Sequence, residues 1–320
     1  MKKYLAIFAV LFTVILSSCT NDDIPVQMGC TVRVNPNPVI SGFAEYNAGE
    51  LTNIPTGYQL RVHLYVYDMN GNNKFSDVQY TSDYSHYITF NVDVPMGEYR
   101  ILTATDVVRT DGSVEYWTFS DEENLTRLKI TNSDYVAEQR GILGYASQTI
   151  TVDAGGELYN IDAKPAGALI FANVQNMKSM ADVVRYDLTT NRRCESLQFT
   201  SNGVPQTSVE SSNTMDWRTV IFEVKDLTGS YTGLYTYYFS LAVNNAKFEW
   251  HGITTENKYR VVGGTYTCSM AMGEEFDFEL DASTKEAYWG KIDLSDLYSS
   301  RSCLDKLSPK NIMPIPSVDE

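Results

Sequence analysis

The sequence predicts an all-β protein made of two antiparallel β-sandwich domains in series. Apolar residues recur at every second position over short segments, and turn signals separate these segments at intervals of roughly 8 to 12 residues. Tyrosine is common, with 22 copies against 13 phenylalanines and 4 tryptophans. Aromatic residues favour strands, and no long amphipathic helix is visible in the first half of the chain.

Residues 58–67 give the clearest strand of the first half. Apolar and polar or aromatic residues alternate there without a break. One side carries Leu60, Val62, Leu64 and Val66, and the other carries Arg61, His63, Tyr65 and Tyr67. This period of two indicates a half-buried strand with its polar face in solvent. We therefore interpret His63 as a surface residue, and likewise His86 and His251.

Further segments repeat this pattern along the chain. In the first half the predicted strands are 87–94, 99–105, 107–108, 114–119 and 147–152. In the second half they are 168–174, 183–188, 219–224, 234–243, 258–262, 265–270 and 276–280. The pair Gly155-Gly156 gives the predicted boundary between a domain at 30–154 and a domain at 155–290. Residues 291–320 contain three prolines and end acidic, which predicts a loosely ordered tail.

The first 18 residues have the form of a secretory signal. Lys2 and Lys3 precede an apolar run over 5–16, which is too short to span a bilayer. The run ends in Leu-Ser-Ser before Cys19, which resembles the lipobox of bacterial lipoproteins. That resemblance implies a lipid on Cys19, a mature chain that begins there, and a polar tether over 19–29. The alternative is an ordinary signal peptide with an accidental cysteine.

Charge argues against nucleic acid as a partner. The full chain has 25 basic and 40 acidic side chains, and loss of Lys2 and Lys3 with the signal lowers the basic count to 23. A body this acidic repels phosphate backbones and anionic headgroups. No later segment reaches 18 apolar residues, so we expect no further membrane span.

No motif in the sequence indicates catalysis, a metal or a cofactor, and we expect no enzyme. The spacing Asp68-x-Asn70-x-Asn72 echoes a calcium loop, but Asn73 and Gln79 stand where that loop needs glycine and glutamate, so we interpret it as a turn. Apart from Cys19, the cysteines are Cys30, Cys194, Cys268 and Cys303. An oxidising route permits disulfides between them, three pairings are possible, and isolated buried thiols are an equal alternative.

Several features together resemble the FimB/Mfa2 family of fimbrial anchor lipoproteins from the Bacteroidetes. They are the lipobox cysteine, the strand over 60–68 with Asn70-Gly71 after it, the turn into Gly97-Glu98-Tyr99-Arg100-Ile101, and a second β domain that opens at 168–174. The resemblance implies two transthyretin-like sandwiches and attachment to the cell outer membrane, exposed at the surface, through Cys19. It also implies pilin subunits as partners, docked by strand complementation. We expect the body to receive a neighbour rather than to donate its proline-bearing tail.

A surface glycan-binding lipoprotein is the alternative function. Aromatic rings at loop tips can stack on sugars, and Trp117 and Trp250 lie beside predicted strand ends. This alternative requires both rings to face solvent, whereas the anchor function requires an exposed sheet edge or groove.

Overall fold

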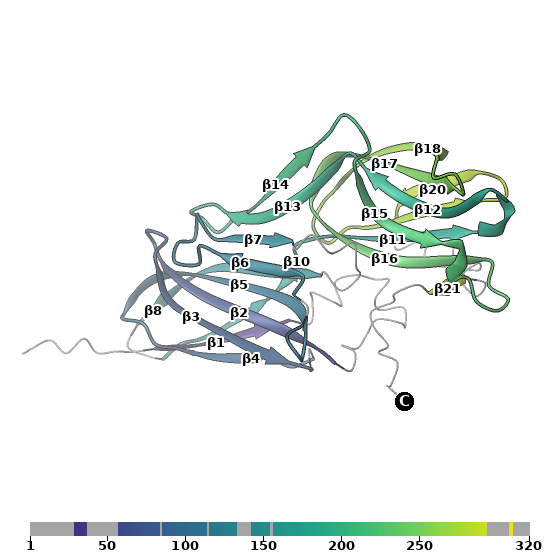
Figure 1. The fold of residues 1–320 in the computed structure, drawn as a ribbon. Helices are drawn as coiled ribbons and strands as arrows, with labels where there is room; N and C mark the ends of the chain where they lie inside the picture. The colour runs from purple at the N-terminus through teal and green to yellow at the C-terminus, as the bar shows by residue number, and fades with distance from the viewer. Residues whose placement is uncertain are drawn as a thin grey trace, which may run out of the picture.

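The computed structural model describes residues 29–36, 57–83, 85–113, 115–132, 142–153, 156–292 and 307–309. The predicted signal, Cys19 and Cys303 lie outside these residues. Strands dominate the described chain, which confirms the predicted all-β sandwich fold. Two single-turn 3-10 helices, η1 (Met177–Ser179) and η2 (Val224–Asp226), interrupt them. Figure 1 shows two β bodies, with β13 and β14 reaching from the second body over the first.

The first sandwich contains a sheet of three strands and a sheet of five. The order β4-β1-β9 combines β4 (Ile88–Val92), β1 (Cys30–Asn35) and β9 (Leu158–Asp162). The order β10-β8-β5-β2-β3 combines β10 (Lys164–Pro165), β8 (Leu143–Val152), β5 (Gly97–Arg109), β2 (Tyr58–Asp68) and β3 (Asn73–Thr81). Strands β9 and β10 follow Gly156 in the sequence, so the passage to the second sandwich comes after Pro165.

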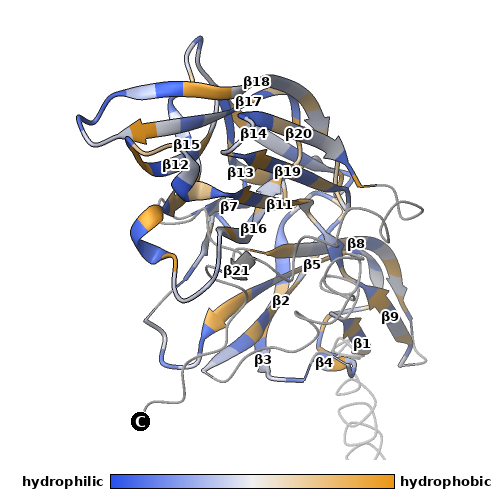
Figure 2. Ribbon diagram, turned by 90° about the vertical axis from the view of Figure 1, so that its right-hand side faces the viewer, coloured by the Kyte–Doolittle hydropathy of each residue, from blue (hydrophilic) through white to orange (hydrophobic). Residues whose placement is uncertain are grey.

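The second sandwich also contains two sheets. The order β20-β19-β11-β16-β21 combines β20 (Glu286–Lys291), β19 (Glu275–Asp281), β11 (Gly167–Gln175), β16 (Gly233–Leu241) and β21 (Leu307–Pro309). The order β15-β12-β17-β18 combines β15 (Trp217–Glu223), β12 (Val183–Thr190), β17 (Val243–Thr254) and β18 (Tyr259–Met270). Hydrophilic and hydrophobic bands alternate along β17 and β18 (Figure 2). Strand β21 lies within the segment for which we expected a loose tail.

A fifth sheet, which we call the bridging sheet, joins the two sandwiches. Its order β14-β13-β7-β6 combines β14 (Pro205–Ser211), β13 (Arg192–Phe199), β7 (Lys129–Asn132) and β6 (Trp117–Ser120). Strands β6 and β7 come from the first half of the chain, and β13 and β14 come from the second. The junction is an antiparallel register from Lys129 opposite Gln198 to Thr131 opposite Ser196.

The bridging sheet buries the face of β2 that we expected in solvent. Phe119 on β6 stacks on His63 with ring centroids 3.9 Å apart, and the guanidinium of Arg61 lies 5.2 Å from the centroid of the Phe119 ring. Arg61, His63, Tyr65 and Tyr67 are all buried. The prediction of a strand was correct, but the prediction of a solvated polar face was wrong because a distant pair of strands covers it.

The two sandwiches also share apolar packing through β11 and β16. On β11, Ala168 and Ile170 point into the core of the second sandwich, whereas Leu169 and Phe171 belong to the cluster centred on the first. On β16, Tyr235 and its neighbours at every second position join that first cluster as well. Both faces of these strands are therefore buried, which explains their nearly continuous burial.

Two adjacent glycines in β18 provide a test of packing between β18 and β20. Gly263 and Gly264 have φ of 76° and 79°. A Cβ on Gly263 would lie 2.3 Å from the Cβ of Ala287, whereas a Cβ on Gly264 would meet nothing within 4 Å. We expect Gly264→Ala to cost about 1 kcal/mol through left-handed backbone strain. Gly263→Ala should cost about 2 kcal/mol more because of overpacking. Urea unfolding of both variants measures the difference, and equal costs would contradict the contact.

Candidate docking edges and a buried polar cluster

The two tryptophans proposed for glycan contact are buried. Trp117 is 1% exposed and Trp250 is 0% exposed. Trp250 lies against Phe222 and Trp289, with ring centroids 6.1 and 6.3 Å away. The expectation that these rings face solvent is therefore wrong. Trp117 begins β6 and Trp250 lies within β17, so neither ring is at a loop tip and both are packed in the interior.

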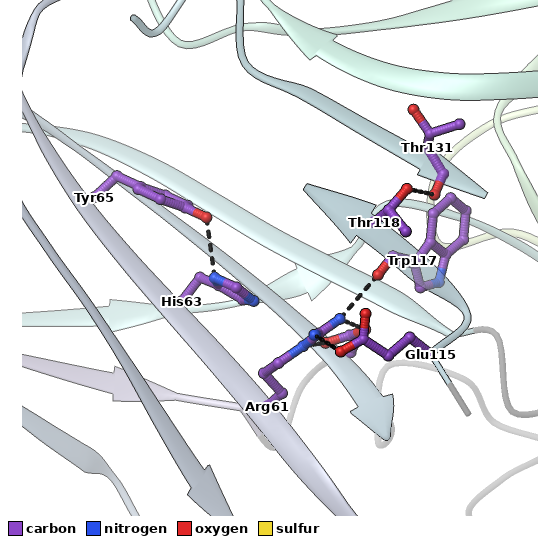
Figure 3. Close-up of polar contacts among 8 residues, drawn as sticks. Arg61, His63, Tyr65, Glu115, Trp117, Thr118 and Thr131 are labelled. Carbon is purple, nitrogen blue, oxygen red and sulfur yellow. Dashed lines mark hydrogen bonds and ion pairs between the residues drawn. The ribbon is translucent and has the colours of Figure 1, made fainter. Parts of the chain in front are cut away.

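A buried ion pair holds β2 to β5 beneath the bridging sheet (Figure 3). Arg61 Nε and Nη2 donate to the two carboxylate oxygens of Asp106 at 2.9 and 2.8 Å. Nη2 also donates to the carbonyl of Trp117 at 2.9 Å, and Nη1 donates to Glu115 at 2.9 Å. The forked guanidinium thus connects β2, β5 and the start of β6, as only an arginine can.

Burial changes the acidity of two groups in this cluster. It raises the pKa of Asp106 to about 6, against the opposing effect of the Arg61 hydrogen bonds and charge. It lowers the pKa of His63 to about 3, and the charge of Arg61 adds to that lowering. His63 Nδ1 lies 3.0 Å from the hydroxyl of Tyr65. Arg61, Asp106, His63 and Tyr65 are buried, and only Glu115 at the edge of the network is half exposed, so we assign the network to stability.

The histidines do not share the surface position that we predicted for them. His86 is exposed, whereas His63 and His251 are buried. His251 lies 3.0 Å from the Glu249 carboxylate and stacks on Tyr259 with ring centroids 5.1 Å apart. Pairing with these neighbours on β17 and β18 explains why a histidine is tolerated there.

The predicted turn after residue 68 is confirmed. The carboxylate of Asp68 accepts hydrogen bonds from the backbone N–H groups of Asn70 and Asn72 at 2.9 Å, and Lys74 pairs with it at 3.1 Å. Asp68 therefore caps its own turn.

Cys30, Cys194 and Cys268 are free thiols, which agrees with the alternative of isolated cysteines. Among the described residues, no three His, Cys, Asp or Glu side chains form a metal-binding group. No helix within the described ranges is long and apolar enough to span a membrane.

Several sheet edges differ in how well they are protected. Strand β3 carries Lys74 and Asp77, and Gln79 donates from β3 to the carbonyl of Thr89 on β4 at 3.1 Å. Strand β18 is approached by β20, where the indole of Trp289 donates to the Gly263 carbonyl at 3.5 Å. These contacts close part of each edge against a new strand.

Strand β14 is the more open edge. It ends the bridging sheet, on the side of β13 away from β7 (Figure 1). None of its residues is buried, and Gln206, Thr207, Ser208 and Val209 form an uncharged stretch. Val204 and Val209 add exposed apolar surface. Sequence patterning missed β14, because its serines and threonines resemble a loop.

Comparison with solved structures finds similar folds in bacterial proteins that are described as candidate adhesins. A candidate adhesin from Bacteroides thetaiotaomicron VPI-5482 has a TM-score of 0.50 and 11% identity, over 85% of this chain and 98% of that one. A candidate cell adhesion protein from Bacteroides ovatus ATCC 8483 has a TM-score of 0.50 and 9% identity, over 84% and 97%. At identities this low, the structural similarity shows a shared fold and nothing more.

The neighbours include the fimbrial anchor protein Mfa2 from Porphyromonas gingivalis, with a TM-score of 0.45 and 10% identity over 82% of this chain and 94% of that one. A fimbrial anchor is thus among the structures similar to this chain, as the sequence resemblance led us to expect. Neither a protein-family model nor a curated protein matches the chain.

Loss of the buried carboxylate should destabilise the fold strongly. We expect Asp106→Asn to cost about 3 kcal/mol, because it leaves the buried Arg61 charge poorly compensated. The control is Lys258→Gln, which breaks an ion pair with Glu256 in which both side chains are more than two-thirds exposed. That change should stay within about 0.5 kcal/mol of the wild type. Urea unfolding at pH 7 compares the two, and similar costs would argue against a structural role for the buried pair.

Acid should weaken the fold through His63. The unfolded chain protonates this histidine near its ordinary pKa, whereas the folded chain keeps it neutral down to about pH 3. The stabilisation of the folded state that comes from neutral His63 is therefore complete above pH 6.5, and it is lost progressively as the pH falls toward 3. Both proteins lose free energy of unfolding when the pH is lowered from 7 to 5. We expect this loss to be roughly 2 kcal/mol smaller in His63→Gln than in the wild type. Asp106 titrates in both proteins and cancels from the comparison. Equal falls in both proteins would exclude a neutral buried His63.

Proposed function

We propose that this chain is a non-catalytic fimbria-associated adhesion protein of the cell surface. In this proposal a lipid on Cys19 ties it to the outer membrane, and the body docks a pilin subunit by accepting a strand. The fold that it shares with candidate adhesins, the lipobox resemblance and the family resemblance of its strands support the proposal. The acidic composition fits a protein that does not engage nucleic acid.

The open edge of β14 carries the docking part of the proposal. A strand added to a sheet edge gains main-chain hydrogen bonds along its length, and side-chain contacts supply specificity. Strand β14 offers seven residues, which is close to the length of an average strand. A neighbour paired there would extend the bridging sheet, which is already connected to both sandwiches.

The turn between β13 and β14 shows which backbone groups point outward. The N–H of Thr200 donates to the carbonyl of Val204 at 2.9 Å, so these residues form a hydrogen-bonded pair. Antiparallel pairs alternate between bonded and non-bonded types. Phe199 opposite Pro205 is then non-bonded, Gln198 opposite Gln206 is bonded, and Leu197 opposite Thr207 is non-bonded. The N–H of Thr207 therefore faces the open edge.

Replacement of Thr207 tests this assignment. Thr207→Pro removes the outward donor and leaves the ladder to β13 intact, whereas Thr207→Val keeps the donor and the β-branched shape. We expect native lipoprotein from gently solubilised outer membranes to carry a heat-sensitive ladder of pilin subunits, seen in unboiled but not in boiled samples. In the proline variant the amount of co-isolated ladder should fall at least about tenfold, because hydrogen bonds at the centre of the edge are lost. The valine variant should carry as much ladder as the wild type.

Thermal melting of both variants must show the same folded state for this comparison to hold. A proline variant that folds normally and keeps its ladder would move the docking site away from β14. A wild-type protein that is isolated as a clean monomer would overturn the pilin-docking function itself.

A further inference from the structure

One face of the second sandwich contains two carboxyl groups in direct contact without a basic partner. Asp277 and Glu279 occupy alternate positions on β19, on the side opposite Phe276 and Phe278 of the core. Asp277 is 7% exposed and hydrogen-bonds to Glu279. Among the described residues no lysine, arginine or histidine forms an ion pair or hydrogen bond with either carboxyl group. Two charges that are this close and this buried need a compensating partner.

A buried amide whose oxygen lacks a hydrogen-bond partner lies at the same place. Asn173 on β11 is 0% exposed and stands opposite Glu279 in the parallel register between β11 and β19. Its amide interacts with the Glu279 carboxylate and opposes the rise in the pKa of that group, whereas the side-chain oxygen of Asn173 and Oδ1 of Asp277 lack a hydrogen-bond partner. Buried amides are almost always paired, so the orphaned oxygen of Asn173 is an independent sign that a ligand belongs here.

The neighbouring strand β20 leaves room beside Asp277 and supplies a further oxygen. Gly290 stands opposite Asp277, and Tyr288 stands opposite Glu279. The Tyr288 side chain lies over Gly290, since a Cβ at that glycine would be 2.6 Å from the tyrosine hydroxyl. Tyr288 is 57% exposed, so the cluster has a side that opens toward solvent. Any larger residue at position 290 would displace the hydroxyl.

We propose that Asp277, Glu279 and Asn173 bind a divalent cation, with calcium as the ion that fits best. All the available atoms are carboxylate, amide and hydroxyl oxygens, which are the ligands that calcium prefers in a flexible sphere of six to eight. Two carboxylates supply up to four oxygens, Asn173 supplies a fifth, and water completes the sphere. Magnesium is a poorer fit because it demands a regular octahedron and keeps its own water. Binding neutralises the pair and gives the Asn173 oxygen a partner.

The competing state of the same cluster is a proton shared between the two carboxyls. Burial and the adjacent Glu279 raise the pKa of Asp277 well above its usual range. A shared proton would neutralise one charge but would leave the Asn173 side-chain oxygen without a partner. The two states differ in their response to calcium, which makes them separable by experiment.

Thermal melting at pH 7.5 with calcium, magnesium or sodium chloride of matched ionic strength tests the site. For an extracellular site with Kd of about 10⁻⁴ to 10⁻³ M, 10 mM calcium should raise the Tm of the wild type by about 4 °C. Asp277→Asn should abolish this rise. Glu286→Gln, which removes an exposed acid from the same edge, should keep it. Terbium provides a second readout, since Tyr288 should sensitise its luminescence in the wild type and not in Asp277→Asn.

Two results would overturn the proposal. One is a wild-type Tm that does not respond to calcium while Asp277→Asn raises the Tm without calcium, which is the result expected for a shared proton. The other is a calcium response that Asp277→Asn retains or that magnesium and sodium reproduce in full, which would indicate binding elsewhere or general screening of the acidic surface.

Discussion

The pairing of β7 with β13 is the constraint on which much of this structure depends. Without it, β6 and β7 would be an isolated hairpin, which is marginal in water. Pairing across three register positions places that hairpin in a four-stranded sheet, fixed at one end by the first half of the chain and at the other by the second. The hairpin can then cover β2, and the polar residues of β2 become interior residues. The buried contacts of Arg61 follow from that coverage.

Covering β2 buries the charge of Arg61, which costs free energy, and the hydrogen-bond partners of Arg61 offset that cost. Burial of an unpaired guanidinium is expensive, and mutual attraction compensates only where geometry is good and the remaining donors are satisfied. Arg61 meets this condition because its three nitrogens donate to Asp106, Glu115 and the Trp117 carbonyl. The Trp117 carbonyl is on the covering strand itself, so the ion pair and the bridging sheet stabilise each other.

Alternation in the sequence predicted the strands well and their surroundings poorly. The segment 58–67 is a strand within one residue of its observed end, and 168–174 matches β11 as closely. Local periodicity reports which residues share a face, but it does not report what covers that face. His63 and Trp117 were misplaced for this reason, since their burial depends on the packing of β6 against β2, which lie far apart in the sequence. Alternation likewise predicted the strand that carries Asp277 and Glu279, but nothing nearby in the sequence reveals the unpartnered oxygen of Asn173 beside them.

Protection of two other edges supports the docking role that we propose for β14. Long edge strands template aggregation, and proteins protect them with charges, bulges or cover. The two longest edge strands of the sandwiches follow this rule. Strand β3 carries Lys74 within reach of Asp68, and β18 is kinked at Gly263-Gly264 and contacted by Trp289. Strand β14 has four consecutive uncharged residues and no cover among the described residues. An open edge without a partner promotes aggregation, so an edge left open where two others are protected is consistent with the proposed partner strand.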